Sequence, residues 1–89
     1  MTKKAAKKLK FGDLLVQTTI VFKGESKFII AIKVEDNQLY HVHINKEKPM
    51  YINIRYFRKP YKSELTKKIM KQYKTALLKL SLKRDLLII

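Results

Sequence analysis

Hydrophobic and polar residues alternate along much of the chain from Phe11 onward, which is the pattern of β-strands that bury one face. Even-numbered positions are apolar in four successive segments, with Thr18 as the exception. These segments span residues 14–22, 28–34, 40–44 and 50–56. β-Branched and aromatic residues dominate them, as expected for a pleated, half-buried surface. Because the parity holds throughout, the pattern predicts four strands whose even-numbered side chains form one core face.

Short polar stretches separate the four segments and contain residues that favour turns. They are residues 23–26, 35–38 and 45–49. Consecutive hairpins of this length predict an antiparallel meander. Loops centred on Glu25, Asn37 and Glu47 would keep even residues opposite even ones. The odd-numbered face, which includes His41 and Tyr51, is then polar and aromatic, and we interpret it as a solvent-exposed sheet face, with base reading as the alternative.

The C-terminal segment changes to the three-to-four-residue spacing of an amphipathic helix. Ser63 is a suitable N-cap, and Glu64 in the first turn complements the positive end of the helix dipole. The apolar stripe contains Leu65, Ile69, Tyr73, Ala76 and Leu80, with Leu77 at its edge, and the opposite side contains Lys67, Lys68, Lys71, Lys74 and Lys79. We therefore predict a helix that packs on the core face of the sheet and either breaks near Ser81 or continues onto another chain.

The chain ends in four apolar residues, Leu86 to Ile89, which are rarely left in water. They either extend the helix, add a fifth strand or bury in a second subunit, and we favour a homodimer formed through the C-terminal helix and tail. The predicted fold class is α+β: a four-stranded antiparallel meander, open or curled into a small barrel, followed by one C-terminal amphipathic helix. We expect a flexible basic arm over residues 1–10 and a single β-β-β-β-α domain over residues 11–89.

In the order of its elements alone, this arrangement resembles the single-stranded-DNA-binding fold of transcription coactivators that dimerise through their C-terminal helix. A small SH3-like or OB-like barrel is the competing architecture, and its closure would require Leu86 to Ile89 as a fifth strand.

The net charge of +14 is distributed unevenly along the chain. Residues 1–10 contain five lysines and no acid, residues 11–57 contain six cations and five acids, and residues 58–89 contain ten cations and two acids. An anionic partner should therefore contact the two ends of the sequence more than the predicted sheet.

The rest of the composition narrows the class of protein. The absence of cysteine excludes disulfides and thiol catalysis. No apolar run is long enough to span a bilayer, so we predict a cytoplasmic protein with no membrane span. The cysteine-free composition, rich in lysine and isoleucine, would suit a small phage, plasmid or low-GC bacterial protein.

The segment Met50 to Lys62 ends as a hinge in which cations and aromatic residues surround Pro60. Cations meet phosphates and rings stack on bases, so this mixture favours nucleic acid, DNA or RNA, as the partner. A strand end with core aromatics and solvated cations is the alternative. The residues expected to contact nucleic acid are Lys3, Lys4, Lys7, Lys8, Lys33, Tyr51, Arg55, Phe57, Arg58, Lys59, Tyr61, Lys62, Lys67, Lys71 and Lys74.

Candidate catalytic chemistry is sparse. His41 and His43 share a strand face but lack a third ligand, so we predict no metal site. A histidine base assisted by Lys33 or Arg55 would suit a nuclease, although the sequence contains no Walker loop, dinucleotide fingerprint or nucleophile elbow. We therefore predict a non-enzymatic nucleic-acid-binding protein without cofactors. The alternative is a small interaction or inhibitor module that docks on an acidic protein.

Overall fold

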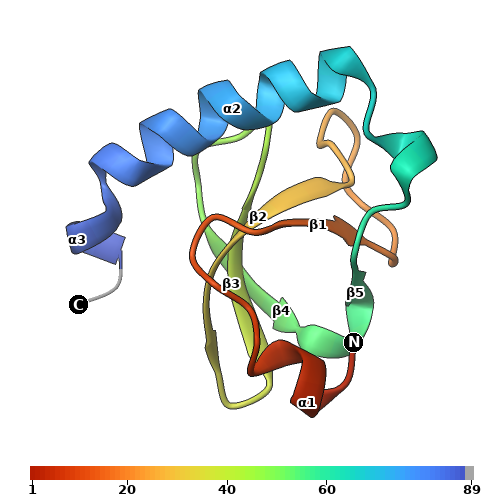
Figure 1. Cartoon of the computed structure of the whole chain (residues 1–89). Coiled ribbons are helices and arrows are strands. Elements are labelled where there is room, and N and C mark those ends of the chain that lie inside the picture. Colours follow the sequence, from red (N-terminus) through yellow and green to blue (C-terminus); the bar gives the residue numbers. More distant parts are fainter. Residues whose placement is uncertain (88–89) are drawn as a thin grey trace.

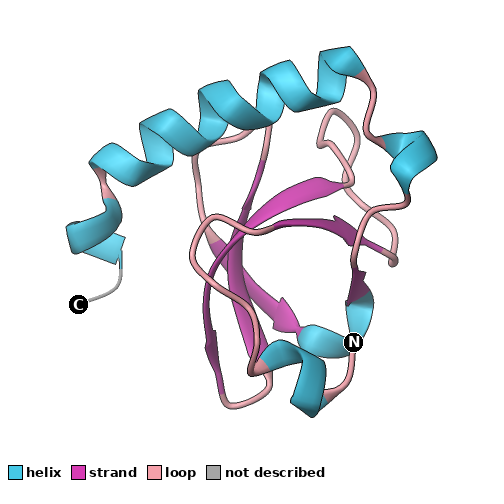
Figure 2. Ribbon diagram, viewed as in Figure 1, coloured by secondary structure: helices cyan, strands magenta, loops and turns pink. Residues whose placement is uncertain are grey.

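Five antiparallel strands and three α-helices make up residues 1–87, the part of the chain that the computed structural model describes (Figures 1 and 2). The strands are β1 (Leu14–Gln17), β2 (Phe28–Glu35), β3 (Gln38–His43), β4 (Met50–Asn53) and β5 (Phe57–Arg58). The helices are α1 (Lys3–Ala6), α2 (Lys67–Leu82) and α3 (Arg84–Leu87), and the 3-10 turns are η1 (Ile54–Tyr56) and η2 (Lys62–Glu64). The α+β class and the antiparallel meander with a C-terminal helix are confirmed.

The sheet has the order β4-β3-β2-β1-β5 and does not close into a barrel. The predicted fourth strand ends early, at Asn53, because the Asn53 side chain accepts a hydrogen bond from the Arg55 N–H (3.0 Å) and starts the turn η1. The chain then crosses to the other edge of the sheet, where β5 pairs with β1. The fifth strand is therefore not the tail: Leu86 and Leu87 belong to α3, and Ile88 and Ile89 lie outside the described residues.

The even-numbered residues of β1 and β3 and of the first part of β2 pack beneath α2, as predicted (Figure 1). In β4 the prediction is wrong, because the even-numbered Ile52 packs against the other side of the sheet, opposite Leu39. The buried residues beneath α2, which we call the helix-side core, are Val16, Phe28, Ile30, Ile32, Val42, Ile44 and Leu80. The predicted helix stripe residues Ile69, Tyr73, Ala76 and Leu77 pack against it. Tyr73 also donates a hydrogen bond from its hydroxyl to the Gly12 carbonyl, which ties α2 to the segment before β1.

The side of the sheet away from α2 is also largely buried, which corrects the prediction that the odd-numbered face is a solvent-exposed sheet face, although the odd-numbered Tyr51 is exposed. Its buried residues, which we call the far-side core, are Ala6, Leu15, Ile29, Ala31, Leu39, Ile54 and Phe57. This core exists because α1 and η1 lie on the side of the sheet away from α2 (Figure 1), and because Phe57 of the edge strand β5 packs there.

Residues 1–10 pack on this far-side core instead of extending as the flexible arm we expected. The Thr2 hydroxyl caps α1 by accepting a hydrogen bond from the Ala5 N–H (3.1 Å). Ala6 is 4% exposed, and Met1 and Leu9 pack against the same core. The small Ala6 side chain allows α1 to lie close to the sheet, which the lysine-rich sequence conceals.

The strand pairing differs from the predicted register in all three hairpins. Val16 pairs with Phe28, so the β1–β2 loop is centred near Phe22 and not on Glu25. β1 consequently ends at Gln17, and Ile20 and Phe22, predicted as core residues, are 93% and 76% exposed.

The second difference is in β2, where a bulge between Ala31 and Lys33 shifts the pairing with β3. The following turn has two central residues, Asp36 and Asn37, both at positive φ (49° and 64°), as a type I′ hairpin requires. After the bulge an even residue faces an odd one, so Tyr40 lies opposite Lys33. The third difference is between β3 and β4, where His41 pairs with Met50, so the loop is not centred on Glu47 and Tyr40 lies opposite Tyr51.

α2 begins three residues later than predicted. Its N-cap is Thr66, whose hydroxyl accepts a hydrogen bond from the Ile69 N–H (3.2 Å), while Ser63 lies in η2. The helix ends at Leu82, and α3 starts after Lys83, so the predicted break near Ser81 falls slightly later. Within residues 1–87, no helix combines the length and the hydrophobicity that crossing a bilayer requires.

Candidate nucleic-acid interface

Most of the positive charge has no carboxylate beside it. Of the 21 lysine and arginine side chains, only Lys27, Lys33 and Arg58 lie within 4.0 Å of a carboxylate among residues 1–87. The other 18 have no carboxylate within that distance among the described residues, so the surface carries a large excess of positive charge.

The outer face of α2 carries three predicted contact residues in a row. Lys67, Lys71 and Lys74 are exposed and recur at spacings of four and three residues, which places them on one side of the helix. No acidic residue occurs between Leu65 and Arg84. Like charges at this spacing repel one another, so an anion along the helix would lower the electrostatic free energy of this row.

The hinge between β5 and α2 is organised around one carboxylate, that of Glu64. The Arg58 guanidinium donates to both of its oxygens (2.7 and 3.0 Å), Lys27 Nζ donates to it at 3.0 Å, and the Tyr61 N–H donates at 2.8 Å. These donors, with Arg58 first, hold the pKa of Glu64 far below its usual value, and Glu64 raises the pKa of Arg58. Arg58 therefore stabilises the hinge, and its guanidinium, which could have bound a phosphate, is already paired with Glu64.

Other hinge residues remain open to a ligand. Lys59 and Lys62 are exposed, and the Tyr61 ring, 62% exposed, lies 4.1 Å from the Arg58 guanidinium. Phe57, in contrast, is 1% exposed, so it fills the far-side core and does not offer the stacking surface that we expected.

The packing of α1 brings part of the predicted N-terminal arm to the hinge. Lys4 and Lys8 line a hollow of about 290 Å³ together with Lys59. From there the chain runs along β5 and η2 to α2 (Figure 1). We call this set the basic strip: Lys4, Lys8, Lys59, Lys62, Lys67, Lys71 and Lys74.

Several predicted contact residues lie away from the strip. Lys3, Lys7 and Lys33 line a second hollow, of about 590 Å³, together with Arg84. Lys33 Nζ lies 3.4 Å from Glu35, which raises the Lys33 pKa.

Tyr51 and Arg55 follow one another along β4 and η1 and make local contacts. The Tyr51 ring packs 4.5 Å from that of Tyr40, and its hydroxyl donates to Glu35 (3.2 Å). Arg55 lies over the Tyr56 ring and donates to its hydroxyl (2.9 Å). The structure therefore divides the predicted footprint into the basic strip and separate groups of residues.

The two histidines are enclosed. His41 and His43 are 0% and 2% exposed, and their rings lie 5.6 Å apart. His41 Nδ1 is 2.9 Å from the Leu39 carbonyl and His43 Nδ1 is 2.6 Å from that of Ser26. Neither ring is open to a substrate, and among residues 1–87 no three metal-binding side chains gather. The two histidines that the nuclease alternative would use as a base are therefore both buried.

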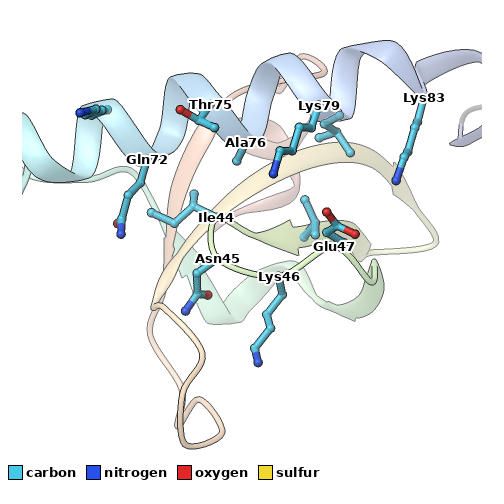
Figure 3. Close-up of a pocket in the computed structure, with 12 residues that line it drawn as sticks. Ile44, Asn45, Lys46, Glu47, Gln72, Thr75, Ala76, Lys79 and Lys83 are labelled. Carbon is cyan, nitrogen blue, oxygen red and sulfur yellow. The ribbon is translucent and has the colours of Figure 1, made fainter.

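One cationic site was missed by the sequence reasoning. Lys46, Lys79 and Lys83 join Lys71 around a groove beneath α2 (Figure 3). The four-residue spacing of Lys71, Thr75, Lys79 and Lys83 was an available signal for the helix side of this groove. Lys46 comes from the β3–β4 loop, and only the fold places it there.

Comparisons with known proteins found no family, relative or structure to set beside this geometry: no protein-family model, curated protein or solved structure matches the chain. The functional proposals therefore start from the placement of its own residues.

Proposed function

We propose that the protein is a non-enzymatic nucleic-acid-binding protein of the cytoplasm and that its basic strip follows a phosphate backbone. The observation that carries this proposal is the row formed by Lys67, Lys71 and Lys74, exposed on one helix face with no acid on α2. A polyanion bound along the row relieves the repulsion, and the release of its counterions increases the binding affinity further.

The strip supports backbone contacts more than base reading. Lysine ammonium groups bind phosphates without reporting sequence. Tyr61, between Lys59 and Lys62 in the hinge, is the exposed ring best placed to stack on an unpaired base. We therefore expect similar affinity across sequences and a steep dependence on salt.

The test is fluorescence anisotropy with labelled single-stranded DNA, duplex DNA and RNA of equal length, at low and near-physiological salt. The triple variant Lys67→Gln, Lys71→Gln, Lys74→Gln should bind at least tenfold more weakly at low salt. Its slope of log affinity against log salt should fall by about three, roughly one for each phosphate contact removed.

The matched control is Lys10→Gln, Lys23→Gln, Lys48→Gln, which also changes exposed lysines and lowers the net charge from +14 by three, to +11. It should bind nearly as the parent does. Equal losses in the two triple variants would show that charge alone, without the strip, accounts for binding. Unchanged binding in the first variant would remove α2 from the interface.

A protein-interaction or inhibitor module that docks on an acidic partner is the second candidate function. Leu78 favours it, because this side chain is 66% exposed on the same helix face as Lys71 and Lys74. Nucleic acid carried through purification distinguishes the two: with five tyrosines and no tryptophan, even a small contaminant raises the 260/280 absorbance ratio. A clean protein with no affinity for nucleic acid would favour the second function.

A homodimer through the C-terminal helices is a further part of the proposal. Leu78, Leu82 and Leu86 recur every four residues and are exposed. Sedimentation at several concentrations tests this, and a monomer at the highest concentration would remove the dimer.

A further inference from the structure

The underside of α2 and the β3–β4 loop enclose a groove of about 400 Å³ (Figure 3). Its floor is aliphatic and is formed by Val42, Ile44, Ala76 and Leu80. Its rim carries Lys46, Lys71, Lys79 and Lys83, against one acidic residue, Glu47. An apolar floor with a cationic rim suits a ligand that is both aliphatic and anionic.

We propose that this groove binds an acidic, aliphatic segment of a partner protein. An aliphatic side chain of the segment would pack on Ala76 and Leu80, and flanking carboxylates would meet the lysines. Figure 3 shows Gln72, Lys79 and Lys83 directed from α2 towards the loop, where they can reach a bound chain.

The dimensions favour an extended segment. Lys71 and Lys83 are twelve positions apart, about 18 Å along a helix at about 1.5 Å per residue. An extended peptide covers that distance with about five or six residues, at about 3.3 Å each. A small anion would satisfy only one end of the rim, whereas a short acidic segment reaches both.

The lining chemistry favours a peptide over a nucleobase. No aromatic side chain lines the groove among the described residues, so a base would find no ring to stack on. The methylene stems of the rim lysines instead extend the aliphatic surface. The groove also differs from the basic strip, with which it shares only Lys71, so this inference does not rest on the proposed function.

The experiment titrates the full chain with a labelled eight-residue peptide of alternating glutamate and leucine, read by anisotropy and by NMR shifts of the residues that line the groove. A glutamate–serine peptide of equal charge measures the electrostatic part alone. We expect the glutamate–leucine peptide to bind at least tenfold more tightly and to shift the signals of Ile44, Ala76 and Leu80.

The test variant is Lys46→Gln, Lys79→Gln, and the control with the same net charge is Lys10→Gln, Lys23→Gln. All four lysines are exposed, so neither pair disturbs the core. The test pair should weaken binding of the glutamate–leucine peptide at least fivefold, and the control pair should weaken it less than twofold.

Three outcomes would overturn the proposal. The two peptides could bind equally, the test and control pairs could behave alike, or the groove signals could shift with an oligonucleotide and not with the peptide. The last outcome would assign the groove to nucleic acid. The proposed function is tested with oligonucleotides, and the groove is tested with a peptide and with the Lys46→Gln, Lys79→Gln pair, which leaves the basic strip unchanged. The failure of one is therefore separate from the failure of the other.

Discussion

The two faces of the sheet are covered in different ways. The helix-side core lies beneath one long amphipathic helix and is apolar throughout. The far-side core is covered by the short elements α1 and η1 and is completed by Phe57 of the edge strand β5. Three polar residues, Gln17, His41 and His43, are buried on odd-numbered positions of the sheet. A face can therefore be buried without showing an apolar period, provided that distant segments fold over it.

The polar groups on the far side are incompletely satisfied. Gln17 Oε1 and His41 Nε2 have no hydrogen-bond partner among the described residues. An unpaired buried polar group costs free energy, so the far-side core should be stabilised chiefly by its apolar members. Phe57, whose ring lies 4.8 Å from that of His41, is the largest of them.

The largest expected effect comes from truncating one phenylalanine on each side. Phe57→Ala and Phe28→Ala remove rings that are 1% and 5% exposed, and each should lower the free energy of unfolding by about 3–5 kcal/mol. Urea denaturation monitored by far-UV circular dichroism measures both. A loss below about 1 kcal/mol for Phe57→Ala alone would show that the far side is only loosely packed.

A smaller effect tests whether the N-terminal segment belongs to the far-side core. Ala6→Glu places a carboxylate at a buried position and should cost about 1–3 kcal/mol. Ala5→Glu makes the same chemical change one residue earlier, at a half-buried position, and should cost less. Equal stabilities of the two variants would restore the flexible arm expected from the sequence.

The contrast between the faces explains how much of the fold could be predicted. The helix-side core follows from local periods, even positions in the strands and the stripe from Ile69 to Leu80 in the helix. The far side depends on pairings between distant residues. The apolar Ile20 and Phe22 are exposed because β1 and its pairing end before them in the chain. The polar His41 is buried because Phe57, in the distant strand β5, packs against it.

The candidate site divides in the same way. The α2 lysines lie where predicted, because the apolar stripe of a helix determines which side faces solvent. The pairing of Arg58 depends on Glu64, six residues away, which also accepts a hydrogen bond from Lys27, in the loop between two strands. The groove depended on Lys46, which only the fold brings beneath α2. Local spacing predicts a helix face, but not which cations are already paired.

The smallest effect is a dependence of stability on pH, and it sharpens the comparison because it arises on the far side alone. Burial lowers the pKa of His41 below its ordinary value of 6.5, and the neighbouring His43 lowers it further, while the Leu39 carbonyl and Glu25 act in the opposite direction. The neutral ring is thus the form that the folded chain holds, with Nε2 unpaired.

As the pH falls through 6.5, the unfolded chain binds a proton at His41 that the folded chain does not, so the free energy of unfolding decreases. The decrease continues until the pH reaches the lower folded pKa, and above pH 6.5 this residue has no effect on the pH dependence. Urea unfolding at pH 7.5, 6.5 and 5.5 should show a shallower pH dependence in His41→Gln than in the parent. All other side chains are the same in both proteins, so their contribution largely cancels in the difference between the slopes. Parallel slopes would mean that His41 takes up its proton equally in the folded and unfolded chains, so that burial on the far side does not disfavour the charged imidazole.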